Sequence, residues 1–177
     1  MFRAFQLAAL ALGVLVIAGN ASAQMQIMSS AFQNGGSIPA KYSCDSQNPP
    51  NPPLMFSGIP KNAKSLVLIV EDPDVPKTMM PTGVFLHWIV TDISPDTKGF
   101  TEGQGPKGMN GMGKAGYVGP CPPDREHRYF FTLYALDTKV GDAKIASRKD
   151  FEDAQKAHIL GKAEYMGKYP KSANAKY

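Results

Sequence analysis

Three short apolar runs, each bounded by segments rich in proline or glycine, limit most strongly what this chain can fold into. They occupy residues 65–71, 84–91 and 128–136. All three are rich in β-branched or aromatic residues, so each predicts a strand. The nearly continuous apolar character of the first two indicates burial on both faces. Aromatic side chains at nearly every position of the third indicate a strand at the centre of a sandwich.

The segments between these runs favour a small β-sandwich or barrel. The chain has 15 prolines and 17 glycines, which mark turns along its length. Weaker strand signals lie at residues 25–32 and 54–56. Residues 99–119 are rich in glycine and poor in large apolar side chains, so they predict a long loop. We interpret this loop as a surface excursion, with a flexible lid or a phosphate-cradling nest as the alternative.

One helix is expected near the C-terminus. Ser147 is a suitable N-cap, and Phe151 and His158 fall at helical spacing on one side. Ile159 and Ala163 add to the apolar surface of this segment. We therefore expect a helix that packs over one end of the sheets.

Residues 1–23 have the pattern of a secretory signal peptide. A single cation, Arg3, precedes an apolar run at residues 7–18, and the small residues Ala21-Ser22-Ala23 follow. The apolar run is shorter than the roughly 20 residues that a transmembrane helix needs. We therefore expect cleavage after Ala23 and a single mature domain, residues 24–177, in a periplasm or outside the cell.

The charge of the chain argues against nucleic acid as a partner. The formal net charge is +4, and the basic residues are spread through loops and the C-terminal segment. Nucleic-acid-binding domains gather them into a patch or stripe, often with interleaved aromatic residues. A weak preference for anionic ligands remains compatible with this charge.

The chain has two cysteines, Cys44 and Cys121. In an exported protein they are expected to form a disulfide, with two separate buried thiols as the alternative. Because the bridge would close a long loop, the chain-entropy model assigns it roughly 4 kcal/mol. Neither the spacing nor the neighbours of these cysteines indicate a zinc site.

Acidic and imidazole side chains stand where the predicted strands begin or end. Asp72 and Asp74 flank a proline after the first strand, His87 lies within the second, and His127 precedes the third. Each has a structural alternative, because an aspartate here can cap a turn and a buried histidine is often a satisfied core group. The two histidines and an aspartate can converge only at one end of the sheets, which favours a binding site.

Tyr129 and the turn that contains Gly119-Pro120 complete the candidate site. The Tyr129 ring either packs in the core alone or also extends its hydroxyl into the pocket. The prolines of the turn restrict its backbone and leave the amide hydrogens of Gly119 and Cys121 free to point at an oxyanion. We expect Asp72 to orient one imidazole, while the remaining ring nitrogens and the turn amides donate to a phosphate or carboxylate.

Residues 65–76, 87–88 and 119–136 resemble the signature segments of the phosphatidylethanolamine-binding protein family, whose bacterial branch is called Raf kinase inhibitor-like. Residues 157–160 and 163–165 resemble the C-terminal helix of that branch. The resemblance implies a mainly β sandwich of two antiparallel sheets with a C-terminal helix. It also implies a small cavity for phosphate, acetate or a phosphoethanolamine head group, lined by Asp72, Asp74, His87, Gly119, Pro120, His127 and Tyr129.

The resemblance implies a ligand-binding or regulatory protein rather than an enzyme, and no cofactor or resident metal. The chain has no Gly-x-Ser-x-Gly elbow and no metal-binding helix motif. The alternatives are a hydrolase-like enzyme that uses the Asp/His pocket, an iron site of two histidines and a carboxylate, and an inhibitor that acts through its surface. An exported chain meets no cytosolic kinase, so the kinase function of the family is not transferred. Peripheral contact with a membrane is also left open.

The chain departs from the family pattern at residues 48–56. The family usually has a serine hydroxyl and a tryptophan in this segment, which this chain lacks. Residues 84–86 likewise replace a tryptophan-rich approach to His87. We therefore expect a pocket rim with fewer aromatic side chains.

Overall fold

The computed structural model describes residues 24–141, 145 and 147–175. The predicted signal peptide, residues 1–23, lies outside the described part of the chain. In the described part, no helix combines the length and the apolar character needed to cross a membrane.

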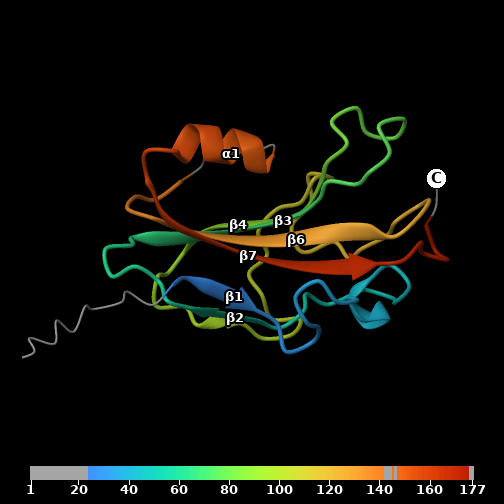
Figure 1. Ribbon diagram of the computed structural model, residues 1–177, viewed down its shortest axis with the longest axis horizontal. Coiled ribbons are helices and arrows are strands. Elements are labelled where there is room, and N and C mark those ends of the chain that lie inside the picture. The colour runs from blue at the N-terminus through green and yellow to red at the C-terminus, as the bar shows by residue number, and fades with distance from the viewer. Residues whose placement is uncertain (1–23, 142–144, 146, 176–177) are drawn as a thin grey trace, which may run out of the picture.

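The strands form two antiparallel sheets that face each other (Figure 1). The smaller sheet has the order β1 (Gln26–Met28), β2 (Leu54–Ser57) and β5 (Gly99–Phe100). The larger sheet has the order β4 (Phe85–Ile93), β3 (Ser65–Asp72), β6 (His127–Leu136) and β7 (Ile159–Tyr169). A short 3-10 helix, η1 (Ala40–Tyr42), and one α-helix, α1 (Arg148–Gln155), complete the fold. The predicted two-sheet sandwich is confirmed.

The three apolar runs become β3, β4 and β6, three of the four strands of the larger sheet, and both faces of this sheet are covered. Every residue of β3 is buried. Leu66 and Leu68 face the smaller sheet in the main core, whereas Val67 and Ile69 belong to a second apolar cluster that includes Phe151 of α1. A strand covered on both faces needs apolar side chains at successive positions, which explains the continuous pattern.

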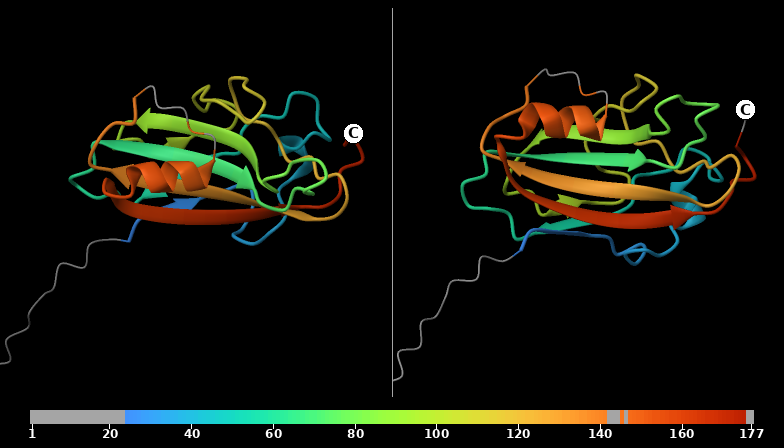
Figure 2. Two further views of the ribbon diagram at one scale, coloured as in Figure 1. Left: turned by 90° about the horizontal axis from the view of Figure 1, so that it is seen from above. Right: turned by 45° about the horizontal axis from the view of Figure 1, so that its top comes forward.

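Helix α1 lies over the outer face of the larger sheet, toward one end (Figures 1 and 2). Its predicted start is confirmed, because the Ser147 hydroxyl accepts a hydrogen bond from the Asp150 amide at 3.1 Å. The helical prediction for residues 159–165 is wrong, because these residues belong to the outer strand β7. Ala163, Tyr165, Gly167 and Tyr169 are buried, and the residues between them are more exposed. This alternation has the period of a strand.

Residues 99–119 were predicted to form a long loop, and most of them are irregular, but two parts of this segment extend the sheets. Gly99 and Phe100 pair with β2, and Met109 forms an isolated bridge with Ile89 of β4. Asn110 organises the following turn, because its side-chain oxygen accepts a hydrogen bond from the Met112 amide and its side-chain nitrogen donates to the Gly116 carbonyl, both at 3.0 Å. The connection therefore runs along the free edge of β4.

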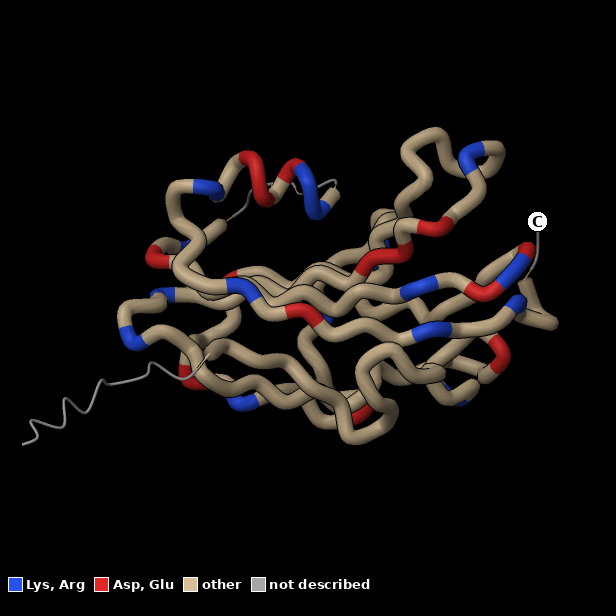
Figure 3. The backbone as a smooth tube through the Cα atoms, viewed as in Figure 1, with Lys and Arg blue, Asp and Glu red and all other residues tan. Residues whose placement is uncertain are grey.

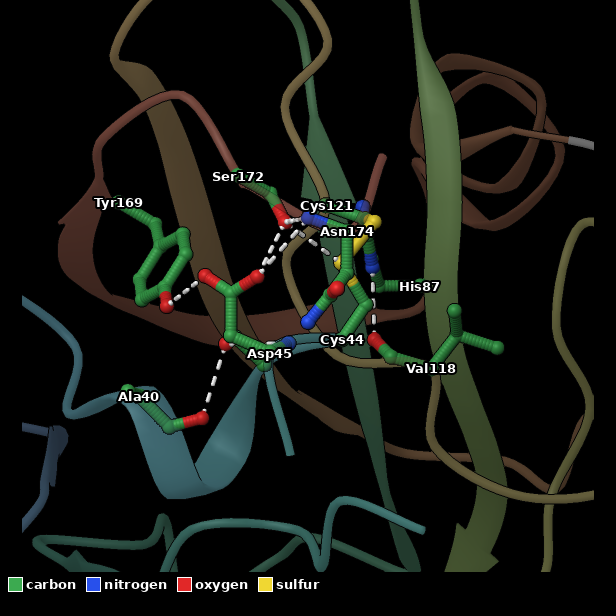
Figure 4. The surroundings of a disulfide bond; sticks show 10 residues. Ala40, Cys44, Asp45, His87, Val118, Cys121, Tyr169, Ser172 and Asn174 are labelled. Carbon is green, nitrogen blue, oxygen red and sulfur yellow. Dashed lines mark hydrogen bonds between the residues drawn. A yellow bond between two sulfur atoms is a disulfide. The ribbon is translucent and has the colours of Figure 1, made fainter. Parts of the chain in front are cut away.

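Cys44 and Cys121 form the expected disulfide, across 77 residues of sequence. The bridge ties the turn after Val118 to the segment that follows η1 (Figure 4). The Cys44 amide also donates to the Pro120 carbonyl at 3.0 Å. These two links hold the turn in place at the end of the larger sheet.

Charged residues of both signs are interspersed over the described surface (Figure 3). Several form ion pairs, and one of these joins Arg148 of α1 to the buried Glu71 of β3 at 2.7 Å. The same arginine reaches Glu164 of β7 at 2.7 Å. This network fastens the helix to the sheet beneath it.

Candidate functional site

A hollow of about 380 Å³ opens where β3 ends and where β4 and β6 begin. These three strand ends meet at one edge because β3 pairs antiparallel with both neighbours. The hollow is lined by Asp72, Val75, Met79, Met80, Phe85, His87, Met112, Val118, Gly119, Cys121, Pro123 and His127. Four of the predicted site residues line it, namely Asp72, His87, Gly119 and His127. Asp74, Pro120 and Tyr129 do not.

His127 is held between two carboxylates. Its side chain is fully buried, its Nδ1 lies 2.7 Å from Asp72 Oδ2, and its Nε2 lies 2.8 Å from Asp124 Oδ1. A carboxylate can only accept a hydrogen bond, so the ring faces an acceptor at each of its two nitrogens. The expectation that Asp72 orients an imidazole is confirmed. The expectation that the second nitrogen of this ring faces a ligand is wrong for His127, because Asp124 occupies that nitrogen.

Asp74 has a structural role rather than a place in the hollow. Its two carboxylate oxygens accept hydrogen bonds from Arg128 Nη2 at 2.7 Å and Nε at 2.8 Å. The hydrogen bonds from Arg128 hold the pKa of the Asp74 carboxyl below its ordinary value. The Asp74 amide donates to Asp72 Oδ1 at 2.8 Å, which closes the turn at Pro73. The turn-capping alternative therefore applies to this pair of aspartates, and Asp72 serves both the turn and His127.

His87 presents one ring nitrogen to the hollow. Its Nδ1 lies 2.7 Å from the Val118 carbonyl oxygen (Figure 4). Because a carbonyl can only accept, Nδ1 carries the proton, and in the neutral ring Nε2 is then the acceptor. Nε2 makes no hydrogen bond within the described residues. The ring packs edge-on against Tyr129 and Phe85, with centroids 5.1 Å and 4.8 Å apart. Burial lowers the pKa of His87, so the ring is neutral at pH 7.

Tyr129 lies behind the His87 ring, and its hydroxyl is buried without a hydrogen-bond partner among the described residues. Burial raises the pKa of Tyr129, and the nearby Asp72 carboxylate raises it further, so the phenol stays protonated. A buried polar atom without a partner costs about 1–3 kcal/mol, and such atoms are rare in folded proteins. The core-packing alternative therefore describes Tyr129, whose buried hydroxyl lies near Asp72 and outside the lining of the hollow.

The turn at Gly119 supplies a backbone donor. The Gly119 amide makes no hydrogen bond to the described residues, whereas the Cys121 amide lies near the Tyr129 hydroxyl. A Cβ atom at position 119 would collide with the Tyr42 carbonyl oxygen, so only glycine lets the turn lie against the segment that follows η1. Pro120 contributes through its carbonyl, which accepts from Cys44. Of the two amides predicted to be unpaired, the turn therefore leaves that of Gly119 without a partner among the described residues.

The family follows from the match of the sequence to a family model. Residues 28–170 match the model described as phosphatidylethanolamine-binding protein. The chain belongs to this family. Two proteins named UPF0098 are among its relatives, one from Chlamydia trachomatis that is 46% identical over 150 residues and one from Methanothermobacter thermautotrophicus that is 43% identical over 154 residues. The alignments cover 83% of this chain and 99% of the first relative, and 82% of this chain and 98% of the second.

Solved structures of family members have the same architecture. The phosphatidylethanolamine-binding protein homologue from Chlamydia trachomatis is 45% identical, with a TM-score of 0.76 over 84% of this chain and 99% of the homologue. YbcL of Escherichia coli, described as a new member of the mammalian family, is 26% identical, with a TM-score of 0.69 over 85% of this chain and 100% of YbcL. The fold implied by the resemblance is therefore that of known relatives.

Sequence reasoning missed two features of this family member's hollow. Asp124 stands three residues before His127, a spacing that could have indicated a contact. The methionines of the rim, Met79, Met80 and Met112, lie in loops that carry no strand or helix pattern. Among the described residues, no group of three or more His, Cys, Asp or Glu side chains is placed to hold a metal ion. The arrangement therefore offers a backbone hydrogen-bond donor, one free imidazole nitrogen and an apolar rim.

Proposed function

We propose that this family member is an exported binding protein that holds a small anion, or the phosphorylated head group of a larger ligand, in the hollow. The observation that carries the proposal is the meeting of unpaired polar groups at one place. The turn amide of Gly119 and Nε2 of His87 both lack hydrogen-bond partners among the described residues, and both residues line the hollow. Backbone amides in a turn are suited to an oxyanion.

The protonation of His87 makes this binding dependent on pH. The neutral ring accepts a hydrogen bond from a protonated ligand oxygen, whereas the protonated ring donates a charge-assisted hydrogen bond to an anion. Burial lowers the pKa of His87 in the free protein, and a bound anion raises it. Anion binding is therefore coupled to the uptake of one proton by His87 when the pH lies between these two pKa values. The affinity rises by at most about tenfold for each pH unit lowered through this window.

Binding explains the geometry better than hydrolysis does. A general base must be able to receive a proton from the reacting group. Both nitrogens of His127 are engaged by Asp72 and Asp124 at 2.7 and 2.8 Å, which leaves His87 alone for this role. The residues that line the hollow include no serine, threonine or free cysteine that could act as a nucleophile.

Two features support export. The pattern of residues 1–23 is that of a signal peptide, and disulfides such as Cys44–Cys121 persist mainly in oxidising compartments. Expression of the full chain in a Gram-negative host, followed by fractionation and N-terminal sequencing, tests this part of the proposal. We expect mature protein that begins at Gln24 in the periplasm or the medium. A cytoplasmic product that retains Met1 would contradict it.

Calorimetry with sulfate and phosphoethanolamine tests the anion site. Sulfate is useful because it does not titrate between pH 5 and 8. We expect His87→Leu to weaken sulfate binding at pH 5.5 by about 10- to 100-fold, because a hydrogen bond to a charged group is worth about 1.5–3 kcal/mol. His158→Leu is the matched control, since that imidazole is exposed and pairs with Asp137. Far-ultraviolet circular dichroism and thermal unfolding confirm that each variant folds.

The wild-type protein provides a test that does not depend on any variant. NMR of the His87 ring during a sulfate titration should show the ring gaining a proton on binding. The proposal fails if neither anion binds, or if sulfate binds with the same affinity across pH 5–8 and leaves the His87 signals unchanged. Native mass spectrometry of protein purified without phosphate or acetate then identifies any head group that is retained.

A further inference from the structure

The exposed methionines of this protein need an explanation. The large hydrophobic side chains that are exposed in the described part of the chain are all methionines, at positions 28, 55, 79, 109 and 112. Met79 and Met112 are 52% and 54% exposed, and both line the hollow together with Met80. Exposed apolar groups that gather at one place usually mark a binding site. Thioether groups bring a further property, which is that their sulfur atoms are soft metal ligands.

The three methionines reach the hollow from two separate loops. Met79 and Met80 belong to one turn, in which both amides donate to the Pro76 carbonyl at 2.9 and 3.0 Å. Met112 belongs to the turn organised by Asn110, which is 7% exposed. Both turns are hydrogen-bonded internally, so the backbone is fixed while the methionine side chains remain free to adjust. This combination suits a site in which several thioethers close around one ion.

His87 supplies a nitrogen ligand in the protonation form that metal ions require. Its Nδ1–H donates to the Val118 carbonyl at 2.7 Å, and its Nε2 is left without a hydrogen bond in the described chain. Histidines that bind metals almost always donate their second ring N–H to a carbonyl or carboxylate, which fixes the tautomer and the ring orientation. In this protein the Val118 carbonyl accepts that hydrogen bond from His87. Nε2 is therefore a pre-oriented donor atom in the same hollow as three thioethers.

We propose that the hollow is also a binding site for a soft monovalent cation, Cu(I), with Nε2 of His87 and the thioethers of Met79, Met80 and Met112 as its ligands. Thioether and imidazole ligands favour Cu(I), whereas Mg²⁺ and Ca²⁺ require oxygen ligands. The carboxylate of the hollow, Asp72, is already engaged by His127 and by the Asp74 amide. The available ligands therefore select a soft ion over a hard one. No electron transfer is needed, because the ion binds in the state in which it arrives.

Ag(I) serves as the probe because it has the same charge and ligand preference as Cu(I) but does not change its oxidation state under these conditions. The wild-type protein, labelled with ¹³C at the methionine methyl groups, is titrated with silver nitrate in a chloride-free buffer. We expect one tightly bound ion, with shifts of the Met79, Met80 and Met112 methyl signals and of the His87 ring. A competition assay with a chromophoric Cu(I) chelator under anaerobic conditions measures the affinity for Cu(I) itself.

Methionine-to-leucine substitutions separate a metal site from an apolar surface. Leucine keeps the apolar character and most of the volume of methionine but removes the sulfur. We expect Met79→Leu/Met112→Leu to weaken Ag(I) and Cu(I) binding by at least about 10- to 100-fold, the loss seen when even a group that only supports a metal ligand is removed. The matched control is Met28→Leu/Met55→Leu, which removes two exposed thioethers that face each other across β1 and β2.

The outcomes distinguish this proposal from the anion site. Failure of Ag(I) to bind the wild-type protein, or equal binding by the Met79→Leu/Met112→Leu variant, overturns the proposal of a cation site. Loss of binding in the Met28→Leu/Met55→Leu control places the ion on the smaller sheet and also overturns it. Sulfate affinity at pH 5.5 is measured on the same samples. The leucine variants retain His87 and the Gly119 amide, so a cation site can fail while the anion site stands, and the reverse also holds.

Discussion

Removal of the Cys44–Cys121 disulfide should destabilise the protein by about 4.5 kcal/mol. In the chain-entropy model the bridge lowers the entropy of the unfolded chain by an amount that depends on the closed loop, here 77 residues. For a loop of this length at 25 °C the model gives about 4.5 kcal/mol. Each kcal/mol shifts the melting temperature of a domain of this size by roughly 2–4 °C, so we expect a decrease of about 9–18 °C.

Reduction of the wild-type protein is the cleanest form of this experiment because the sequence does not change. Guanidinium unfolding is followed by tryptophan fluorescence, with Trp88 buried in the core as the probe, in the presence and absence of a phosphine reductant. Thermal unfolding under the same conditions gives the second measurement. The double variant Cys44→Ser/Cys121→Ser provides a reference that cannot reoxidise.

The size of the loss in unfolding free energy shows how the disulfide stabilises the protein. The Cys44 amide still donates to the Pro120 carbonyl after reduction, so the turn keeps one tie to the segment that follows η1. A loss well below about 1 kcal/mol would refute the argument from unfolded-chain entropy. A loss well above about 5 kcal/mol, with altered signals from the His87 ring, would show that the native turn also depends on the bridge.

Two further predictions concern buried charges. Asp72→Asn should cost about 3–5 kcal/mol, because it removes the buried carboxylate that pairs with the buried His127 ring; Asp124→Asn, at the exposed end of the same ring, should cost much less, and equal costs in urea unfolding would contradict this order. Arg148→Met should cost about 3–5 kcal/mol at pH 7, because it leaves the carboxylate of Glu71 buried without its cation. Burial raises the pKa of Glu71 in the folded protein, so the unfolded chain loses this proton first and stability falls as pH rises between the two pKa values. The variant should therefore recover stability near pH 4, and Glu71→Gln in the Arg148→Met background should remove most of the defect; a defect that is independent of pH would contradict the explanation.

The sequence predicted the centre of this fold because its strongest signals come from residues with two buried faces. Such strands are apolar at successive positions whatever surrounds them, as β3 shows. The outer strand β7 was mistaken for helix because glycines interrupt it and its apolar residues are few. The helical spacing of Phe151 and His158 then extended the pattern beyond the true end of α1 at Gln155.

The site was predictable where a residue stands at a strand end and less predictable where it depends on a neighbour from another loop. Asp72 and His127 come together because β3 and β6 are adjacent and antiparallel. Asp74 pairs with Arg128 instead of lining the hollow. This pairing depends on the direction in which the long Arg128 side chain extends, and the spacing of residues in the sequence does not reveal that direction. The second partner of His127, Asp124, lies in an irregular turn whose path the sequence does not determine.

The position of β7 has a consequence for how the molecule reaches its native state. This strand, residues 159–169, covers the side of β6 that would otherwise be an open edge. The pairing of β3 with β6 also joins distant parts of the polypeptide, and non-local pairing of this kind slows folding. The larger sheet can close only after β7 has left the ribosome. Until then β6 has one unpaired edge, at which a nascent chain is available to chaperones.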